Sequence, residues 1–111
     1  YQRKKFKLDN LSSEKMWYYV SQIEDDILKM HGIIQIIDNS ILNGNIEEAL
    51  EYIEKLENLN VLGYNDTKAA GYRRLLNHYA ETGDIDNFKL FNEVYGVLTI
   101  LGFIGLLDIP L

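Results

Sequence analysis

The sequence predicts an all-α fold in which tandem antiparallel helical hairpins stack as an α-solenoid of four to five helices. The chain matches itself without a gap when it is shifted by 39 residues, and a period of about 20 to 50 residues is typical of repeat architectures. Apolar residues also recur at the three-four spacing of a helix face. The one proline, Pro110, lies next to the last residue, so no internal proline interrupts a helix.

Two glycine pairs anchor the internal match. Gly32 falls on Gly71 and Gly44 falls on Gly83, so both copies keep one spacing between their glycines. Other matching pairs are Lys29 and Lys68, Ile46 and Ile85, Glu54 and Glu93, and Leu59 and Leu98. We therefore expect two copies of one helical hairpin, which is fewer than the three or so units that a stable array needs. A longer chain or a homo-oligomer is the expected context.

The predicted organisation is a basic tail over residues 1–10 and a single helical-repeat domain over residues 11–111. The domain is divided into a leading helix at 12–24, a hairpin at 26–59 and a hairpin at 65–105. Asn10, Ser12 or Ser13 can cap the leading helix, because each side chain accepts a hydrogen bond from a first-turn amide. Only Asp25 and Asp26 separate this helix from the next, so it either ends there or continues. Its expected buried residues are Met16, Trp17, Val20 and Ile23.

The first hairpin pairs a helix over residues 27–42 with a helix that begins at Ile46, and Gly44 and Asn45 make the turn. The expected buried residues are Met30, Ile34, Ile37, Ile41, Ile46, Ala49, Leu50, Ile53 and Leu56. The opposite face of the second helix is acidic and comprises Glu47, Glu48, Glu51, Glu54 and Glu57. We interpret this face as solvated, with a docking surface for a basic partner as the alternative.

The second hairpin repeats this plan. Asp66 is the expected N-cap of its first helix, which runs to about Glu81, and Gly83 and Asp84 make the turn and the next cap. Its expected core side chains are Ala69, Tyr72, Leu75, Leu76, Tyr79, Ala80, Ile85, Phe88, Phe91, Tyr95 and Leu98. The uncharged segment 94–107 is shorter than the roughly 20 residues of a membrane-spanning helix, so we expect a buried helix or an interface.

The charge is unevenly distributed along the chain, and the composition excludes chemistry that needs cysteine. After the first seven residues, which carry four basic side chains and no acid, the chain has 7 basic and 17 acidic residues, a net charge of −10. Such a body repels a phosphate backbone. The tail is either a solvated terminal segment or a contact for nucleic acid or an acidic partner. Cysteine is absent, which excludes disulfides and thiolate metal sites and is consistent with a cytoplasmic protein.

No catalytic pattern stands out. The residues three positions before His31 and His78 are Leu28 and Leu75, so neither histidine follows a carboxylate at metal-binding spacing on a helix. The chain contains neither a glycine-rich phosphate loop nor a G-x-S-x-G elbow. We therefore predict a protein that is not an enzyme and uses no metal or cofactor. The adjacent bases at positions 73 and 74 either clamp a carboxylate or phosphate or form part of a solvated helix face.

The stretch "GYRRLLNHYAETGDIDNFKLFNEV", residues 71–94, resembles the tetratricopeptide and pentatricopeptide repeats, and "NGNIEEALEYIEKLENLNV" is similar to the second half of such a unit. The resemblance implies a right-handed solenoid whose first helices line a concave face that binds a peptide or single-stranded RNA. The positions that match the base-reading residue are Gln35 and Arg74. Neither is the usual asparagine, serine or threonine, and the period of 39 exceeds the usual value of about 34.

The predicted function is a non-catalytic module that binds a protein or peptide. Its expected contact residues are Gln35, Asp38, Arg73, Arg74, Asn77 and His78. One alternative is a single-stranded RNA-binding protein on the same scaffold, located in the cytoplasm or in an organellar matrix. Another is a small oligomeric structural or toxin-neutralising subunit that assembles through residues 94–107.

Overall fold

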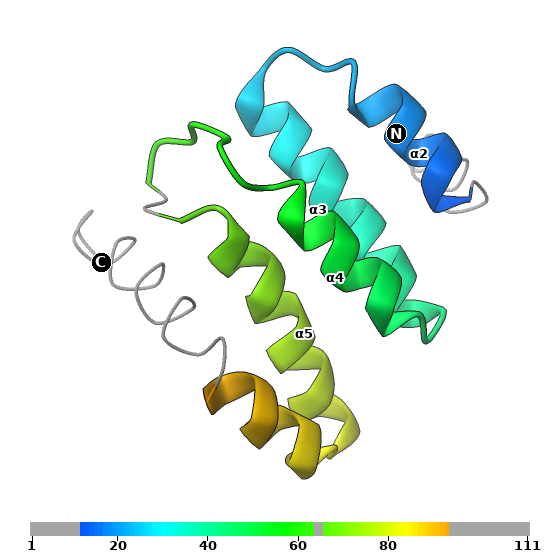
Figure 1. Cartoon of the computed structure of the whole chain (residues 1–111), viewed down its shortest axis with the longest axis vertical. Helices are drawn as coiled ribbons and strands as arrows, with labels where there is room; N and C mark the ends of the chain where they lie inside the picture. Colours follow the sequence, from blue (N-terminus) through cyan, green and yellow to red (C-terminus); the bar gives the residue numbers. More distant parts are fainter. Residues whose placement is uncertain (1–11, 64–65, 94–111) are drawn as a thin grey trace.

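The computed structural model describes residues 12–63 and 66–93, and this part of the chain is helical without strands. Its helices are α2 (Ser13–Val20), α3 (Asp26–Leu42), α4 (Ile46–Glu54) and α5 (Lys68–Thr82), followed by helical residues 85–93 (Figure 1). The all-α prediction is confirmed. The predicted basic tail, Tyr95, Leu98 and the apolar segment 94–107 lie outside the described residues.

The start of α2 is capped by Ser12, whose hydroxyl oxygen accepts a hydrogen bond from the Lys15 amide at 3.2 Å. The helix ends at Val20, four residues before the predicted end at 24. Asp25 then caps α3 by accepting hydrogen bonds from the amides of Ile27 at 2.9 Å and Leu28 at 3.0 Å. Because this cap requires an extended backbone at Asp25, α2 and α3 are separate helices.

The turn between α3 and α4 is built as the sequence predicts. Gly44 has a φ of 74°, in the left-handed region that glycine adopts at low cost. The amide of Asn45 donates to the carbonyl of Ser40 at 2.9 Å, and the Asn45 side chain accepts from the Glu48 amide at 3.1 Å. Helix α4 ends at Glu54, earlier than the predicted hairpin end at 59, because residues 55–58 form turns.

The turn after α5 contains the equivalent bonds 39 residues later. Gly83 has a φ of 73°, and the Asp84 amide donates to the Tyr79 carbonyl at 2.9 Å. The Asp84 carboxylate accepts from the Asn87 amide at 3.3 Å, as Asn45 does from Glu48. The predicted turn and cap of the second hairpin are therefore present.

The predicted cap at the start of α5 is wrong by one residue. Thr67, and not Asp66, is the N-cap, and its side chain makes no capping hydrogen bond. Its hydroxyl donates instead to the carbonyl of Leu56, which ties α5 to the chain that follows α4. Asp66 stands just before it and accepts from the Lys68 amide at 2.9 Å, so it still satisfies one first-turn donor.

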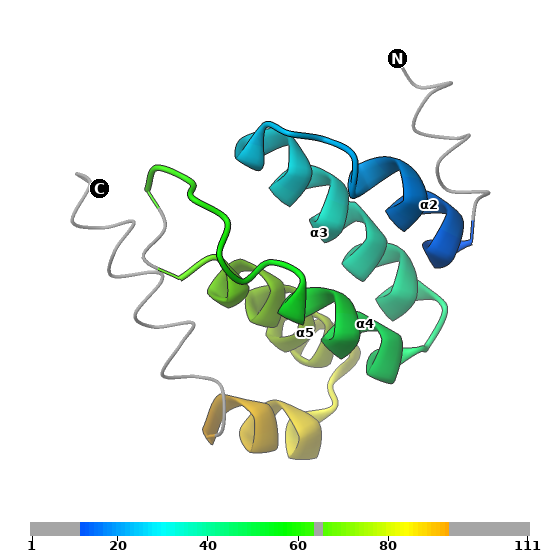
Figure 2. The same cartoon turned by 45° about the horizontal axis from the view of Figure 1, so that its top comes forward.

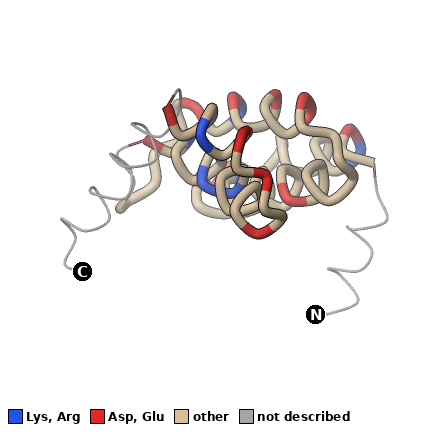
Figure 3. Tube along the Cα trace, turned by 90° about the horizontal axis from the view of Figure 1, so that it is seen from below, with Lys and Arg blue, Asp and Glu red and all other residues tan. Residues whose placement is uncertain are grey.

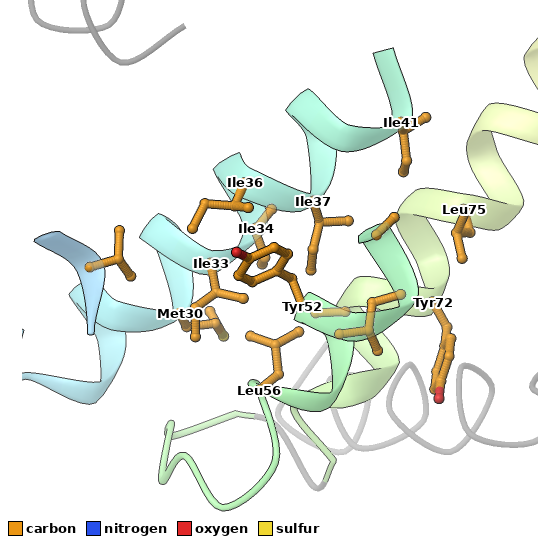
Figure 4. Packing of buried hydrophobic residues seen from close by; sticks show 14 of the residues in the cluster. Met30, Ile33, Ile34, Ile36, Ile37, Ile41, Tyr52, Leu56, Tyr72 and Leu75 are labelled. Carbon is orange, nitrogen blue, oxygen red and sulfur yellow. The ribbon is translucent and has the colours of Figure 1, made fainter. Parts of the chain in front are cut away.

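Helix α4 runs antiparallel to α3, and α5 runs antiparallel to α4, which leaves α3 and α5 parallel (Figures 1 and 2). Side chains from all four helices form one core around α3 (Figure 4). The fully buried members with the largest side chains are Met16, Ile33, Ile36, Ile37, Ile53, Leu56 and Leu75. Tyr72 and Tyr79 are buried as predicted. The prediction is wrong for Ala80, which is exposed, and for Ile85, which is 63% exposed, and neither belongs to the core.

Two glycines allow helices to approach closely. A Cβ atom on Gly32 of α3 would lie 2.8 Å from Cγ2 of Val20 on α2. A Cβ atom on Gly71 of α5 would lie 2.7 Å from Cγ1 of Ile53 on α4. The glycine pair of the internal match thus serves the same purpose twice, at the contact of a helix with the helix before it.

The acidic face of α4 is only partly solvated. Glu48 turns inward, and its Oε2 atom accepts hydrogen bonds from the hydroxyls of Ser13 at 2.9 Å and Ser40 at 2.8 Å. Both serines are buried, so this carboxylate joins α2, α3 and α4. Glu47, in contrast, is exposed. Along the described part of the tube in Figure 3, acidic positions outnumber basic ones. The prediction of a solvated face is correct for Glu47 and wrong for Glu48.

Candidate functional site

Two adjoining surface pockets lie between the parallel helices α3 and α5. Their volumes are about 330 Å³ and about 270 Å³, and they share Arg74 and Asn77. We refer to the two pockets together as the α3/α5 groove. The first pocket is lined by Asp38, Ile41, Leu42, Arg74, Asn77, His78 and Glu81, and the second by Ile34, Ala70, Arg73, Arg74 and Asn77.

The helical spacing explains why these residues meet. On α3, Ile34, Asp38 and Ile41 follow one another at intervals of four and three residues and therefore share one face. On α5, Arg73, Asn77 and Glu81 are spaced by four residues. Because the two helices are parallel, these two rows run side by side in the same direction.

One ion pair crosses the groove. The Nε atom of Arg74 lies 3.7 Å from Oδ1 of Asp38, and the two side chains are 48% and 43% exposed. Pairs that are this open to solvent contribute little to stability, about 0 to 1 kcal/mol. Partial burial raises the pKa of the Asp38 carboxyl, and the Arg74 guanidinium lowers it by less. Both groups thus remain accessible to a charged ligand.

The two ends of the groove differ in charge. The pocket near Ile34 is lined by Arg73 and Arg74 and by no acidic residue. The pocket near Leu42 is lined by Asp38 and Glu81, and Arg74 reaches it as well. Leu42 itself is 84% exposed, which places an apolar side chain beside the acidic end. The groove therefore offers a basic end, an acidic end and an apolar contact on two parallel helices.

The ring of His78 packs beside an aromatic pair. Its ring centroid lies 5.5 Å from that of Tyr79, which in turn stacks on Phe91 at 5.5 Å. Tyr79 is buried, and burial together with the nearby Asp84 carboxylate raises the pKa of its phenol. His78 thus lies beside a buried side chain of the core.

The groove brings together most of the residues that the sequence nominates as contacts. Those that line it are Asp38, Arg73, Arg74, Asn77 and His78. Gln35 is half-buried on α3 and lines neither pocket. The groove residues that the sequence did not nominate are Ile34, Ile41, Leu42, Ala70 and Glu81. Most of them lie three or four residues from Asp38 or Asn77 on the same helix, and this spacing would have identified them. That these side chains bind a partner is still a prediction.

Within residues 12–63 and 66–93, no three His, Cys, Asp or Glu side chains gather in a way that could hold a metal ion. The same described ranges contain no helix with the length and hydropathy needed to cross a membrane. Comparison with protein-family models, with curated proteins and with solved structures finds no match to this chain. The tetratricopeptide-like or pentatricopeptide-like resemblance thus remains a prediction from the sequence.

Proposed function

We propose that the chain is a non-catalytic helical-repeat module that binds an extended segment of a partner protein in the α3/α5 groove. The observation that carries this proposal is the groove itself, in which charged, amide and apolar side chains from two parallel helices converge. Binding sites are concave and combine apolar contacts with a few polar groups of fixed position. In this function the groove binds its partner without catalysing a reaction.

The paired local contacts support the repeat part of the proposal. The turns at Gly44 and Gly83 have nearly the same φ angle, and each is closed by the same backbone bond 39 residues apart. Gly32 and Gly71, also 39 residues apart, both lie against the preceding helix. A stack of such hairpins would place α3 and α5 side by side, as the first helices of successive units.

The groove length suits a short extended peptide. Ile34 and Leu42 are eight residues apart on α3, which corresponds to about 12 Å along the helix axis. An extended chain advances about 3.3 Å per residue, so roughly four ligand residues would fit. An interaction of this size is expected to be weak for one peptide and to gain strength from further repeats or a second copy.

A peptide-display selection tests the proposal. The full chain is used as bait, and enriched peptides are measured against Leu42→Asp and against Leu62→Asp. Both leucines are largely exposed, at 84% and 94%, but Leu62 lies in the loop after α4 and outside the groove. We expect Leu42→Asp to weaken binding at least tenfold and Leu62→Asp to leave it unchanged. Failure to enrich any peptide, or equal binding by both variants, would contradict the proposal.

Single-stranded RNA is the second candidate ligand, because Arg73 and Arg74 line the same pocket. Phosphate groups would be attracted to that end but repelled by Asp38 and Glu81. A filter-binding titration with mixed-sequence RNA separates the candidates. Tight RNA binding that weakens steeply with salt and is lost in Arg74→Glu would favour RNA over a peptide.

A further inference from the structure

We infer that the α3/α5 groove selects a partner segment that carries one acidic and one basic side chain, three or four residues apart. The residue next to the basic one is apolar. This inference rests on the proposed function and names the class of peptide that the groove binds. Three features lead to it: the order of charges along the groove, the distance between them, and the position of Leu42.

The order of charges argues for a ligand of mixed charge. Arg73 and Arg74 line one end, and Glu81 lines the other. Arg74 also lines the pocket that contains Glu81, where it lies 3.7 Å from Asp38, so these two charges partly neutralise each other. A uniformly basic ligand would meet the arginines, and a uniformly acidic ligand would meet Glu81 and Asp38. Only a ligand with both signs of charge complements both ends.

The distance between the ends sets the spacing in the ligand. Arg73 and Glu81 are eight residues apart on α5, or about 12 Å along the helix axis. An extended peptide covers that distance in three to four residues. An adjacent acidic and basic pair would be too short, and a separation of six or more residues would place one charge beyond the groove.

The apolar contact fixes which end carries the hydrophobic residue. Leu42 lines the pocket that also contains Glu81, and its side chain is 84% exposed. Ile41 lines the same pocket and is 7% exposed, so two apolar residues stand beside an acid. A ligand leucine or similar side chain next to the basic residue would cover Leu42 and remove apolar surface from water.

The basic tail of this chain is the competing occupant. Residues 1–7 carry Arg3, Lys4, Lys5 and Lys7 and no acid. Such a segment complements Glu81 and Asp38 but not the arginine end. The charge order thus favours a ligand with both charges over this tail, and the experiment below compares the two kinds of ligand directly.

The test uses four capped peptides that differ only in charge: Gly-Ser-Glu-Ala-Leu-Lys-Ser-Gly and its versions with Glu and Glu, Lys and Lys, or Gln and Gln at the two charged positions. Their dissociation constants are measured with the full chain by NMR titration. We expect the mixed-charge peptide to bind about tenfold more tightly than the Gln peptide, since each exposed ion pair contributes a factor of roughly three. A fifth peptide, in which the acidic and basic residues are adjacent, should lose most of this gain.

Reversal of one end of the groove provides the matched control. Glu81 is exposed, so Glu81→Lys is expected to fold, which a thermal melt confirms. In this variant the preference should move from the mixed-charge peptide to the Glu and Glu peptide. Equal binding of all four peptides, or a preference of the unmodified chain for the Lys and Lys peptide, would overturn the inference and leave the proposed function in place. If none of the peptides binds and display selection also fails, both are overturned.

Discussion

Gly71 of α5 lies directly against Ile53 of α4, so that a Cβ atom at position 71 would come within 2.7 Å of Cγ1 and 3.0 Å of a methyl group of Leu56. Ile53 and Leu56 are fully buried and cannot move into solvent. The closeness of the two helices therefore depends on the absence of a side chain at this position.

We expect Gly71→Ala to destabilise the fold by about 1 to 3 kcal/mol, the usual cost of overpacking. This loss should exceed the gain of up to about 1 kcal/mol from replacing glycine inside a helix. Urea denaturation followed by circular dichroism measures the change. Asn77→Ala, at an exposed position of the same helix, serves as the control for helix propensity. A Gly71→Ala variant as stable as the unmodified chain would contradict the close packing.

A second prediction concerns the carboxylate that joins three helices. Glu48→Ala removes the acceptor at 2.9 Å from Ser13 and 2.8 Å from Ser40. In this variant the Ser40 hydroxyl can still donate to the Ile36 carbonyl, which is 3.0 Å away. Ser13 is buried and loses the Glu48 carboxylate as its acceptor. We expect a loss of about 1 to 3 kcal/mol in the free energy of unfolding.

Glu47→Ala is the matched control for this variant. Glu47 is exposed and belongs to the same first turn of α4, so it shares the favourable interaction with the helix dipole. It should cost no more than about 1 kcal/mol. Equal losses for the two variants would mean that the buried hydrogen bonds of Glu48 contribute nothing beyond the dipole.

The sequence predicts the local features of this fold well because their causes are local. Gly44 with Asn45, and Gly83 with Asp84, contain within two residues the conformation and the acceptor that a helix turn requires. Asp25 likewise caps α3 through amides two and three residues away. Such features need no knowledge of tertiary packing.

The features that sequence reasoning missed depend on residues far apart in the chain. In the sequence, Glu48 belongs to a row of acidic residues that is expected to be solvated. In the structure it turns inward because it accepts a hydrogen bond from Ser13, which is 35 residues away in the sequence. Thr67 displaces Asp66 as the cap of α5 while its hydroxyl binds the Leu56 carbonyl. The role of Leu42 as a groove residue appears only when α3 and α5 are placed side by side.

A third prediction concerns the only tryptophan. The Nζ atom of Lys55 lies 5.3 Å from the ring centroid of Trp17, and this ring also packs edge-on against Tyr52 at 6.0 Å. Lys55→Gln should lower stability by about 0.5 to 1 kcal/mol, whereas Lys55→Arg should retain it. Because the chain has one Trp, its fluorescence reports on this site alone. A double-mutant cycle with Trp17→Leu measures the coupling, and a coupling of zero would rule out the interaction.

The last prediction follows from the raised pKa of Asp38 in the groove, where burial outweighs the opposing effect of Arg74. At pH values between the unfolded and the folded pKa, the folded chain binds more protons than the unfolded chain, so stability falls as pH rises through this window. At neutral pH the ionised carboxylate therefore costs stability, and Asp38→Asn should increase the free energy of unfolding. The gain should be below about 1 kcal/mol, because the side chain is 43% exposed and solvent screens its charge.

The pH dependence of this variant distinguishes burial from ion pairing. Below an unfolded pKa of about 3.9, Asp38 is neutral in both states, and Asp38→Asn should then have almost no effect. Urea denaturation at pH 7 and at pH 3 makes the comparison, with Glu81→Gln as an exposed control in the same groove. If Asp38→Asn is instead destabilising at pH 7 and neutral at pH 3, attraction to Arg74 outweighs burial. The ion pair would then hold α3 and α5 together, and a ligand would have to break it in order to bind.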